Sequence, residues 1–149
     1  MVAGLDPDFA DRLYSRAFEI QERKASGYWL PIMRYLAFRG HLNAMVTLAA
    51  SKSDAKSGTD IGRAGEYFTA AWLYRSAYRS GSAIAAQNLA MAHFNKNDLA
   101  GYRHWLRRAA RAGDAEAGAE LKRFETRLPH QAAREIGRQR PCRRRELTS

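Results

Sequence analysis

The chain has 149 residues, a mass of 16.8 kDa and a formal net charge of +10 at pH 7. This length is typical of one domain, and apolar residues, at 46%, suffice for a packed core. No apolar run approaches the ~20 residues that cross a bilayer. The single cysteine excludes an internal disulfide or a cysteine-based zinc site. Because the N-terminal residues lack a secretory pattern, we expect a cytoplasmic protein.

The basic surplus is divided evenly between the body of the chain and its last residues. Residues 1–126 carry 18 Lys and Arg against 13 Asp and Glu, a net of +5. Residues 127–149 carry 7 Arg against 2 Glu, again +5. So mild a surplus in the body is by itself a weak sign of nucleic-acid binding. The segment 128–149 is predicted to be a flexible basic tail, with candidate contacts to phosphates or acidic proteins at Arg143, Arg144 and Arg145.

Helix signals follow one another along the chain, and no segment shows the alternation of a strand. Asp6 and Pro7 predict a helix start, and apolar residues at helical spacing continue it over residues 7–24. Further helices are expected at residues 28–39, 42–51, 63–80, 83–94, 99–112 and 115–127. A polar, turn-rich segment at residues 52–60 predicts the clearest loop. The expected fold class is therefore all-α, with about seven helices.

Three glycines mark an internal repeat. Alanine stands four residues after Gly40, Gly81 and Gly113, and leucine stands eight residues after each of them. Glycine supplies the left-handed backbone of a turn, and small neighbours let two antiparallel helices approach there. Since one such hairpin cannot bury its own apolar face, the hairpins must stack. The sequence thus predicts a short α-solenoid of stacked antiparallel helix pairs with a groove on one side.

Residues 98–121 carry the best copy of this repeat. Within it, residues 105–114 (Trp-Leu-Arg-Arg-Ala-Ala-Arg-Ala-Gly-Asp) resemble the core of the Sel1-like repeats, relatives of the tetratricopeptide repeats. Residues 81–90 resemble a second part of that pattern, whereas the loops inside the repeats depart from it. The resemblance implies Sel1-like repeats over residues 28–127, preceded by an N-terminal capping helix over residues 1–27.

Residue types that carry catalysis are present but not grouped. No histidine stands at metal-ligand spacing from another histidine, a cysteine or an acid; the four are His41, His93, His104 and His130. We expect a half-buried structural role for His93, which takes the place of a packing tyrosine, and a solvated position for His104. Asp98 and Asp114 are explained as helix caps. The sequence therefore predicts no enzyme activity, no metal and no cofactor.

What remains is a stacked helical surface, and such surfaces bind other proteins. The Sel1-like resemblance implies an adaptor or inhibitor, and one such role is a bacterial cytosolic immunity protein that neutralises a cognate toxin or effector. A partner in the groove is expected to contact Arg34, Asn43, Thr47, Gln87, Met91 and His93. The alternative is a regulatory adaptor that binds nucleic acid through the arginine-rich tail and a helix stripe formed by Arg75, Arg79, Arg103, Arg107 and Arg111.

Overall fold

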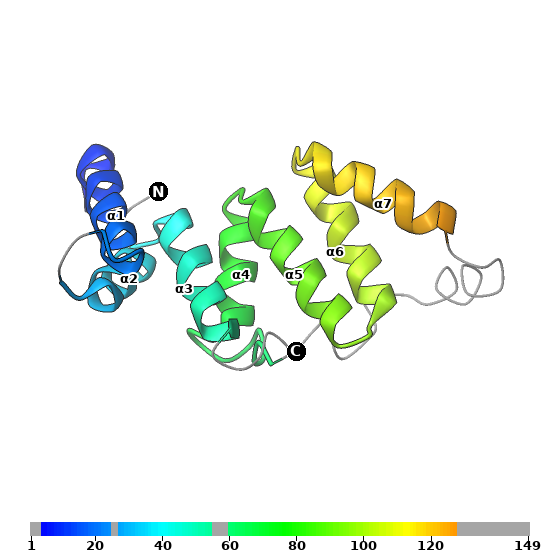
Figure 1. The fold of residues 1–149 in the computed structure, drawn as a ribbon, viewed down its shortest axis with the longest axis horizontal. Coiled ribbons are helices and arrows are strands. Elements are labelled where there is room, and N and C mark those ends of the chain that lie inside the picture. Colours follow the sequence, from blue (N-terminus) through cyan, green and yellow to red (C-terminus); the bar gives the residue numbers. More distant parts are fainter. Residues whose placement is uncertain (1–3, 25–26, 55–59, 128–149) are drawn as a thin grey trace.

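The computed structural model describes residues 4–24, 27–54 and 60–127, and these residues form seven α-helices and no strand (Figure 1). The helices are α1 (Pro7–Gln21), α2 (Trp29–Phe38), α3 (Leu42–Asp54), α4 (Ala70–Arg79), α5 (Ala83–Asn95), α6 (Leu99–Arg111) and α7 (Ala115–Arg127). The all-α prediction is confirmed. The expected basic tail, residues 128–149, lies outside the described residues.

The helices are arranged in two rows. Each helix packs against the next one in the chain, and the helices succeed one another along the long axis of the molecule (Figure 1). Other contacts skip one helix: α3 touches α5, the Tyr14 hydroxyl of α1 lies 2.9 Å from the Thr47 hydroxyl of α3, and Tyr78 of α4 meets Trp105 of α6. We call α1, α3, α5 and α7 the odd row and α2, α4 and α6 the even row. This is the arrangement of a short helical solenoid, as predicted.

Residues at equivalent repeat positions form the core between the rows. Ala44, Ala85 and Ala117, each four residues after a turn glycine, are fully buried. Leu48 and Leu89, each eight residues after the glycine, are also buried. A buried leucine contributes about 2 kcal/mol to stability. The repeat read from the sequence therefore marks the positions that hold neighbouring helices together.

The predicted glycine turns are confirmed. Gly40, Gly81 and Gly113 have φ angles of +84°, +106° and +104°, in the left-handed region. At each turn the glycine N–H and the next N–H donate back into the preceding helix, as in the 2.9 Å bond from Gly81 to the Tyr78 carbonyl. Arg23 and Asn97, both at φ +61°, close α1 and α5 in the same way without glycine.

The start of α4 differs from the prediction. A helix was expected from residue 63, but α4 begins at Ala70, and residues 60–69 form an irregular loop. Gly62 and Phe68 have φ angles of +75° and +63°, which no α-helix accommodates. The Thr69 side chain accepts a 3.2 Å hydrogen bond from the Trp72 N–H and thereby caps α4. The periodicity of apolar residues did not reveal this cap.

Candidate partner-binding surfaces

The six residues predicted to contact a partner do not share one surface. Five lie on the odd row, whereas Arg34 lies exposed on α2 of the even row. On the odd row the side chains of Asn43 and Met91 are exposed, and those of Thr47 and Gln87 are half-buried. The Thr47 hydroxyl is also hydrogen-bonded to α1. Only part of the predicted set is therefore open to a partner.

His93 is enclosed between α5 and α6, with 3% of its surface exposed. Its Nδ1–H donates to Asp98 Oδ2 at 2.9 Å, and Asp98 Oδ1 accepts from the Gly101 N–H at 3.0 Å, capping α6. The ring lies so close to Gly101 that a Cβ there would overlap the imidazole and the carboxylate. His93 thus has the structural role expected from its place in the repeat, more deeply buried than predicted, and it presents no surface to a partner. No sequence pattern had indicated the role of Gly101.

His41 has a structural role that the sequence did not indicate. His41 is 4% exposed. Its Nδ1 accepts a 3.1 Å hydrogen bond from the Ala44 N–H and so caps α3. An accepting Nδ1 places the proton on Nε2, which donates to Asp11 Oδ1 of α1 at 2.8 Å. The signal that could have found this cap is position, because Ser82 and Asp114 also follow a turn glycine and also cap the next helix.

The centre of the odd row exposes large apolar side chains. Ile84 and Met91 are 56% and 47% exposed, and Phe94 is 48% exposed. Their separations of seven and three residues place all three on one flank of α5. The helix α5 carries no Lys, Arg, Asp or Glu. We call these three residues the α5 apolar flank.

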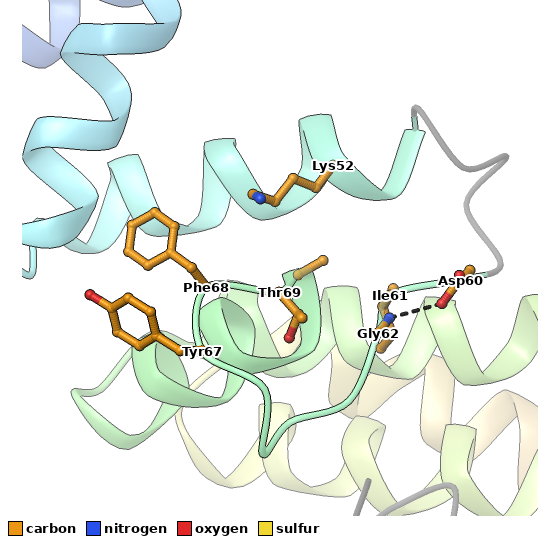
Figure 2. Close-up of a pocket in the computed structure, with 8 residues that line it drawn as sticks. Lys52, Asp60, Ile61, Gly62, Tyr67, Phe68 and Thr69 are labelled. Atoms are coloured by element: carbon orange, nitrogen blue, oxygen red, sulfur yellow. Dashed lines mark hydrogen bonds between the residues drawn. The ribbon is translucent and has the colours of Figure 1, made fainter.

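A cavity of about 370 Å³ lies between the end of α3 and the loop before α4 (Figure 2). Lys52 of α3 borders it, together with the rings of Tyr67 and Phe68, whose centroids are 5.2 Å apart. The Asp60 carboxylate accepts from the Gly62 N–H at 3.0 Å and holds the loop. The Thr69 hydroxyl, which also lines the cavity, lies 2.8 Å from the Arg63 carbonyl oxygen and 3.0 Å from that of Glu66, so it is engaged with the loop.

Arginines gather where α4 meets α6. The guanidinium groups of Arg75 and Arg108 lie over the Trp105 ring, 5.6 and 5.1 Å from its centroid, and Arg108 also lies 5.8 Å from that of Tyr78. His104, predicted to be solvated, is half-buried here. Burial, followed by the charge of Arg108, lowers the pKa of His104 to about 4. The imidazole is therefore neutral at pH 7, and the prediction of a solvated ring was wrong.

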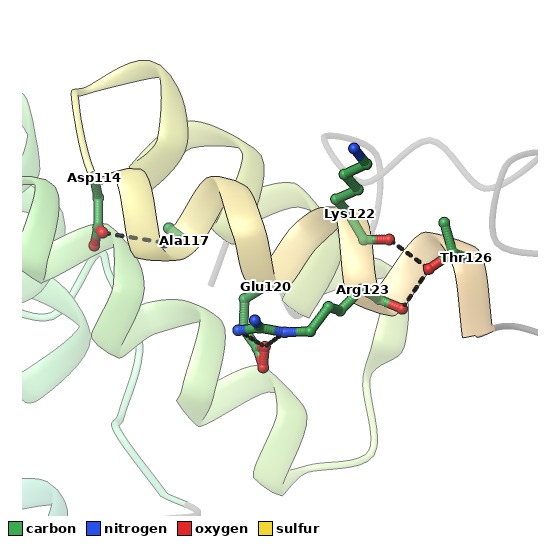
Figure 3. Close-up of polar contacts among 6 residues, drawn as sticks. All are labelled: Asp114, Ala117, Glu120, Lys122, Arg123 and Thr126. Atoms are coloured by element: carbon green, nitrogen blue, oxygen red, sulfur yellow. Dashed lines mark hydrogen bonds and ion pairs between the residues drawn. The ribbon is translucent and has the colours of Figure 1, made fainter.

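Two acidic side chains of α7, and the aspartate that caps it, are engaged within the array. Asp114 accepts from the Ala117 N–H, and Glu120 pairs with Arg123 at 2.9 Å (Figure 3). Glu125 reaches across to α6 and pairs with two of its arginines, Arg103 at 2.8 Å and Arg107 at 3.4 Å. The two Glu125 pairs neutralise the edge of the arginine cluster that faces α7.

Neither a metal centre nor a membrane span is found in the part of the chain that the structure describes. There, no three His, Cys, Asp or Glu side chains are grouped so that they could hold a metal ion. None of the seven helices combines the length and the apolar character needed to cross a membrane. No family model, no curated protein and no solved structure matches the chain.

Proposed function

We propose that this protein is a non-enzymatic module that binds another protein through the odd row of its solenoid. The observation that carries the proposal is the α5 apolar flank. Three large apolar side chains exposed on one flank of an uncharged helix form the kind of patch that is the usual centre of a protein interface. Within the described residues no side-chain constellation for catalysis competes with this interpretation.

The neighbouring helices give this surface the form of an interface. At the position equivalent to Ile84, three residues after the turn glycine, the odd-row helices α3 and α7 carry exposed polar residues, Asn43 and Glu116. An apolar centre with a polar rim is typical of specific protein contacts. Rigid helices hold the centre in place, so a partner that fits it loses little conformational freedom of this chain on binding.

In its sharper form, the proposal is that the protein is a bacterial cytosolic immunity or inhibitor protein whose partner is a cognate toxin or effector. This form rests on the resemblance to Sel1-like repeats and on the small size of the chain. The test is titration calorimetry with the purified product of the adjacent gene. We expect a dissociation constant of about 1 μM or tighter, and no heat of binding at tens of micromolar would contradict the sharper form.

Variants of the α5 apolar flank test the binding surface itself. Ile84→Glu and Met91→Glu place charges at its centre in a helix that tolerates glutamate well. We expect each to weaken partner binding at least tenfold, because a buried interface must then desolvate an unpaired carboxylate. Phe38→Glu is the matched control, since Phe38 is an exposed aromatic residue on the even row. Equal losses for all three variants would contradict the assignment of the surface.

A further inference from the structure

Charged residues are distributed very unequally between the two rows. The three even-row helices contain seven arginines and no Asp, Glu or Lys. The four odd-row helices contain seven Asp and Glu against six Lys and Arg. Ordinary solvated surfaces mix both signs, because interspersed charges relieve repulsion. Exclusion of every acid from a whole row of helices therefore calls for a cause other than solubility.

The arginine seam, as we call it, consists of four arginines from α4 and α6, the even-row helices that meet at Trp105. These are Arg75, Arg79, Arg108 and Arg111. Arg79 and Arg111 are exposed, and Arg75 and Arg108 are held over the Trp105 ring. Among the described residues, no carboxylate lies within ion-pair distance of Arg79, Arg108 or Arg111. The seam therefore concentrates positive charge without an internal counter-charge for these three groups.

The positive charge of this surface lowers the pKa values of two side chains, Arg75 and His104. Burial lowers the pKa of Arg75, and the nearby charges of Arg79 and Arg108 lower it further. The pKa of His104 is lowered to about 4 by burial, with Arg108 and Arg75 among the contributing charges. Packing like charges this closely opposes folding. A bound anion would remove that repulsion.

We infer that the arginine seam binds the phosphate backbone of a single-stranded nucleic acid. Guanidinium groups match phosphate oxygens in two-point hydrogen bonds, and the uniform use of arginine on this row fits that geometry. The Trp105 ring, which both Arg75 and Arg108 contact, holds these two guanidinium groups in place before a ligand arrives. This site is independent of the α5 apolar flank, so it stands or falls separately from the proposed function.

Aromatic side chains on the same row favour a nucleic acid over an acidic protein. Tyr35 and Phe38 are 41% and 69% exposed on α2, beside the exposed Arg34, and the Arg39 guanidinium lies 5.4 Å from the Tyr35 ring centroid. Proteins that bind single strands without sequence preference combine a positively charged track with rings on which bases stack. An acidic polypeptide would use the arginines but would have no need of the exposed rings.

The test measures binding of a fluorescein-labelled single-stranded RNA of mixed sequence, about 20 nucleotides long, to the full chain by anisotropy. Four phosphate contacts predict a slope of about −3 in log K against log salt, a loss of about 50-fold in affinity from ~50 to ~200 mM salt. The variant Arg79→Gln/Arg108→Gln/Arg111→Gln is expected to bind about 100-fold more weakly at ~0.1 M salt and to lose about two units of slope. Circular dichroism is used to check that the triple variant is folded.

A control with the same net charge separates a site from bulk attraction. Arg12→Gln/Arg16→Gln/Arg123→Gln removes three exposed arginines from the odd row, and Arg143→Gln/Arg144→Gln/Arg145→Gln removes three from the tail. The inference is supported if the seam variant loses at least tenfold more affinity than the odd-row control. It is overturned if the two lose equally, or if only the tail variant loses affinity. It is also overturned if poly-glutamate that carries the same number of charges as the RNA competes for the protein as well as unlabelled RNA does at the same concentration.

Should loss of the Arg108 contact with Trp105 unfold the triple variant, the double variant Arg79→Gln/Arg111→Gln replaces it. Both of these side chains are exposed and neither packs on a ring. The expected loss is then about 20-fold against a charge-matched Arg12→Gln/Arg16→Gln control. A loss of less than threefold in the double variant, with an intact fold, overturns the inference.

Discussion

Two successive junctions of the array use the same backbone turn in different surroundings. Gly81 between α4 and α5 and Asn97 between α5 and α6 both adopt positive φ, and each is followed by a capping side chain, Ser82 and Asp98. The first junction is open, since a Cβ on Gly81 would meet nothing within 4 Å. The second is filled by the His93 ring, and α5 with α6 forms the most extensively packed helix pair. Two junctions with the same turn can therefore differ in packing. The most extensive contact, between α5 and α6, lies between two of the glycine-marked hairpins and not within one of them.

The largest effect is expected where the closed junction is forced open. Gly101→Ala gives α6 a better helix former, worth about 1 kcal/mol, but places a methyl group against the His93 ring and the Asp98 carboxylate. Because both side chains are buried and bonded to each other, the methyl group must break that pair or separate the helices. We expect a net loss of about 3 kcal/mol in the free energy of unfolding, measured by urea denaturation.

Gly118→Ala is the matched control for this substitution. Gly118 also lies inside a helix, and a Cβ there meets only the Ala110 methyl group at an ordinary 3.7 Å. We expect a gain of about 0.5–1 kcal/mol from helix propensity. If both substitutions stabilised the protein alike, the close approach at Gly101 would be refuted.

A smaller effect is expected at the cap positions that follow the turn glycines. His41→Ala removes the cap of α3, the bond to Asp11 and a stacked contact with the Tyr14 ring at 5.1 Å. We expect a loss of about 2 kcal/mol, against about 1 kcal/mol for Ser82→Ala, which removes a cap alone. His41→Ser should recover about half of the loss by restoring the cap. Equal losses at the two positions would show that the contacts with α1 contribute nothing.

The features predicted correctly from the sequence are local ones, and those that were missed depend on residues far apart in the chain. The turns at Gly40, Gly81 and Gly113 and the cap at Asp98 were predicted correctly, because local backbone geometry selects those residue types. The bond from His41 to Asp11 spans 30 residues and left no local trace. Similarly, the need for glycine at position 101 comes from a ring on the preceding helix. Long-range packing of this kind is invisible to periodicity.

The candidate surfaces show the same division. Met91 was expected to face a partner and is exposed, whereas burial of His93 to 3% depended on how closely α5 and α6 approach. The arginines of α4 and α6 were recognised as a stripe, but exclusion of acids from a whole row became visible only when the rows were known. Residues 55–59 and the basic tail lie outside the described residues, so the predictions for Arg143, Arg144 and Arg145 stay predictions.

The next prediction concerns the pH dependence of stability that His104 causes. This residue lies on α6, where that helix meets α4. The folded-state pKa of His104 is about 4, below the 6.5 of an unperturbed histidine, because burial and nearby arginines oppose its protonation. The unfolded chain therefore binds one more proton between about pH 4 and 6.5, and stability falls as pH drops through this window. For a half-buried ring screened by solvent we expect a loss of about 1–2 kcal/mol. His104→Gln should remove this part of the pH dependence; an unchanged profile in that variant would contradict the assignment.

The last comparison changes the turn residue at each of the two junctions. Asn97→Gly relieves the cost of a side chain at φ +61° and should stabilise the protein by about 0.5 kcal/mol, after the greater entropy of glycine in the unfolded chain is subtracted. Gly81→Ala introduces that cost at φ +106° and should destabilise by about 1 kcal/mol or more, although no atom obstructs the new methyl group. Thermal unfolding monitored by circular dichroism measures both. Opposite signs would show that the two junctions share one backbone geometry, which favours glycine at both positions. Equal signs would break that comparison, because the turn at Asn97 would then depend on its side chain.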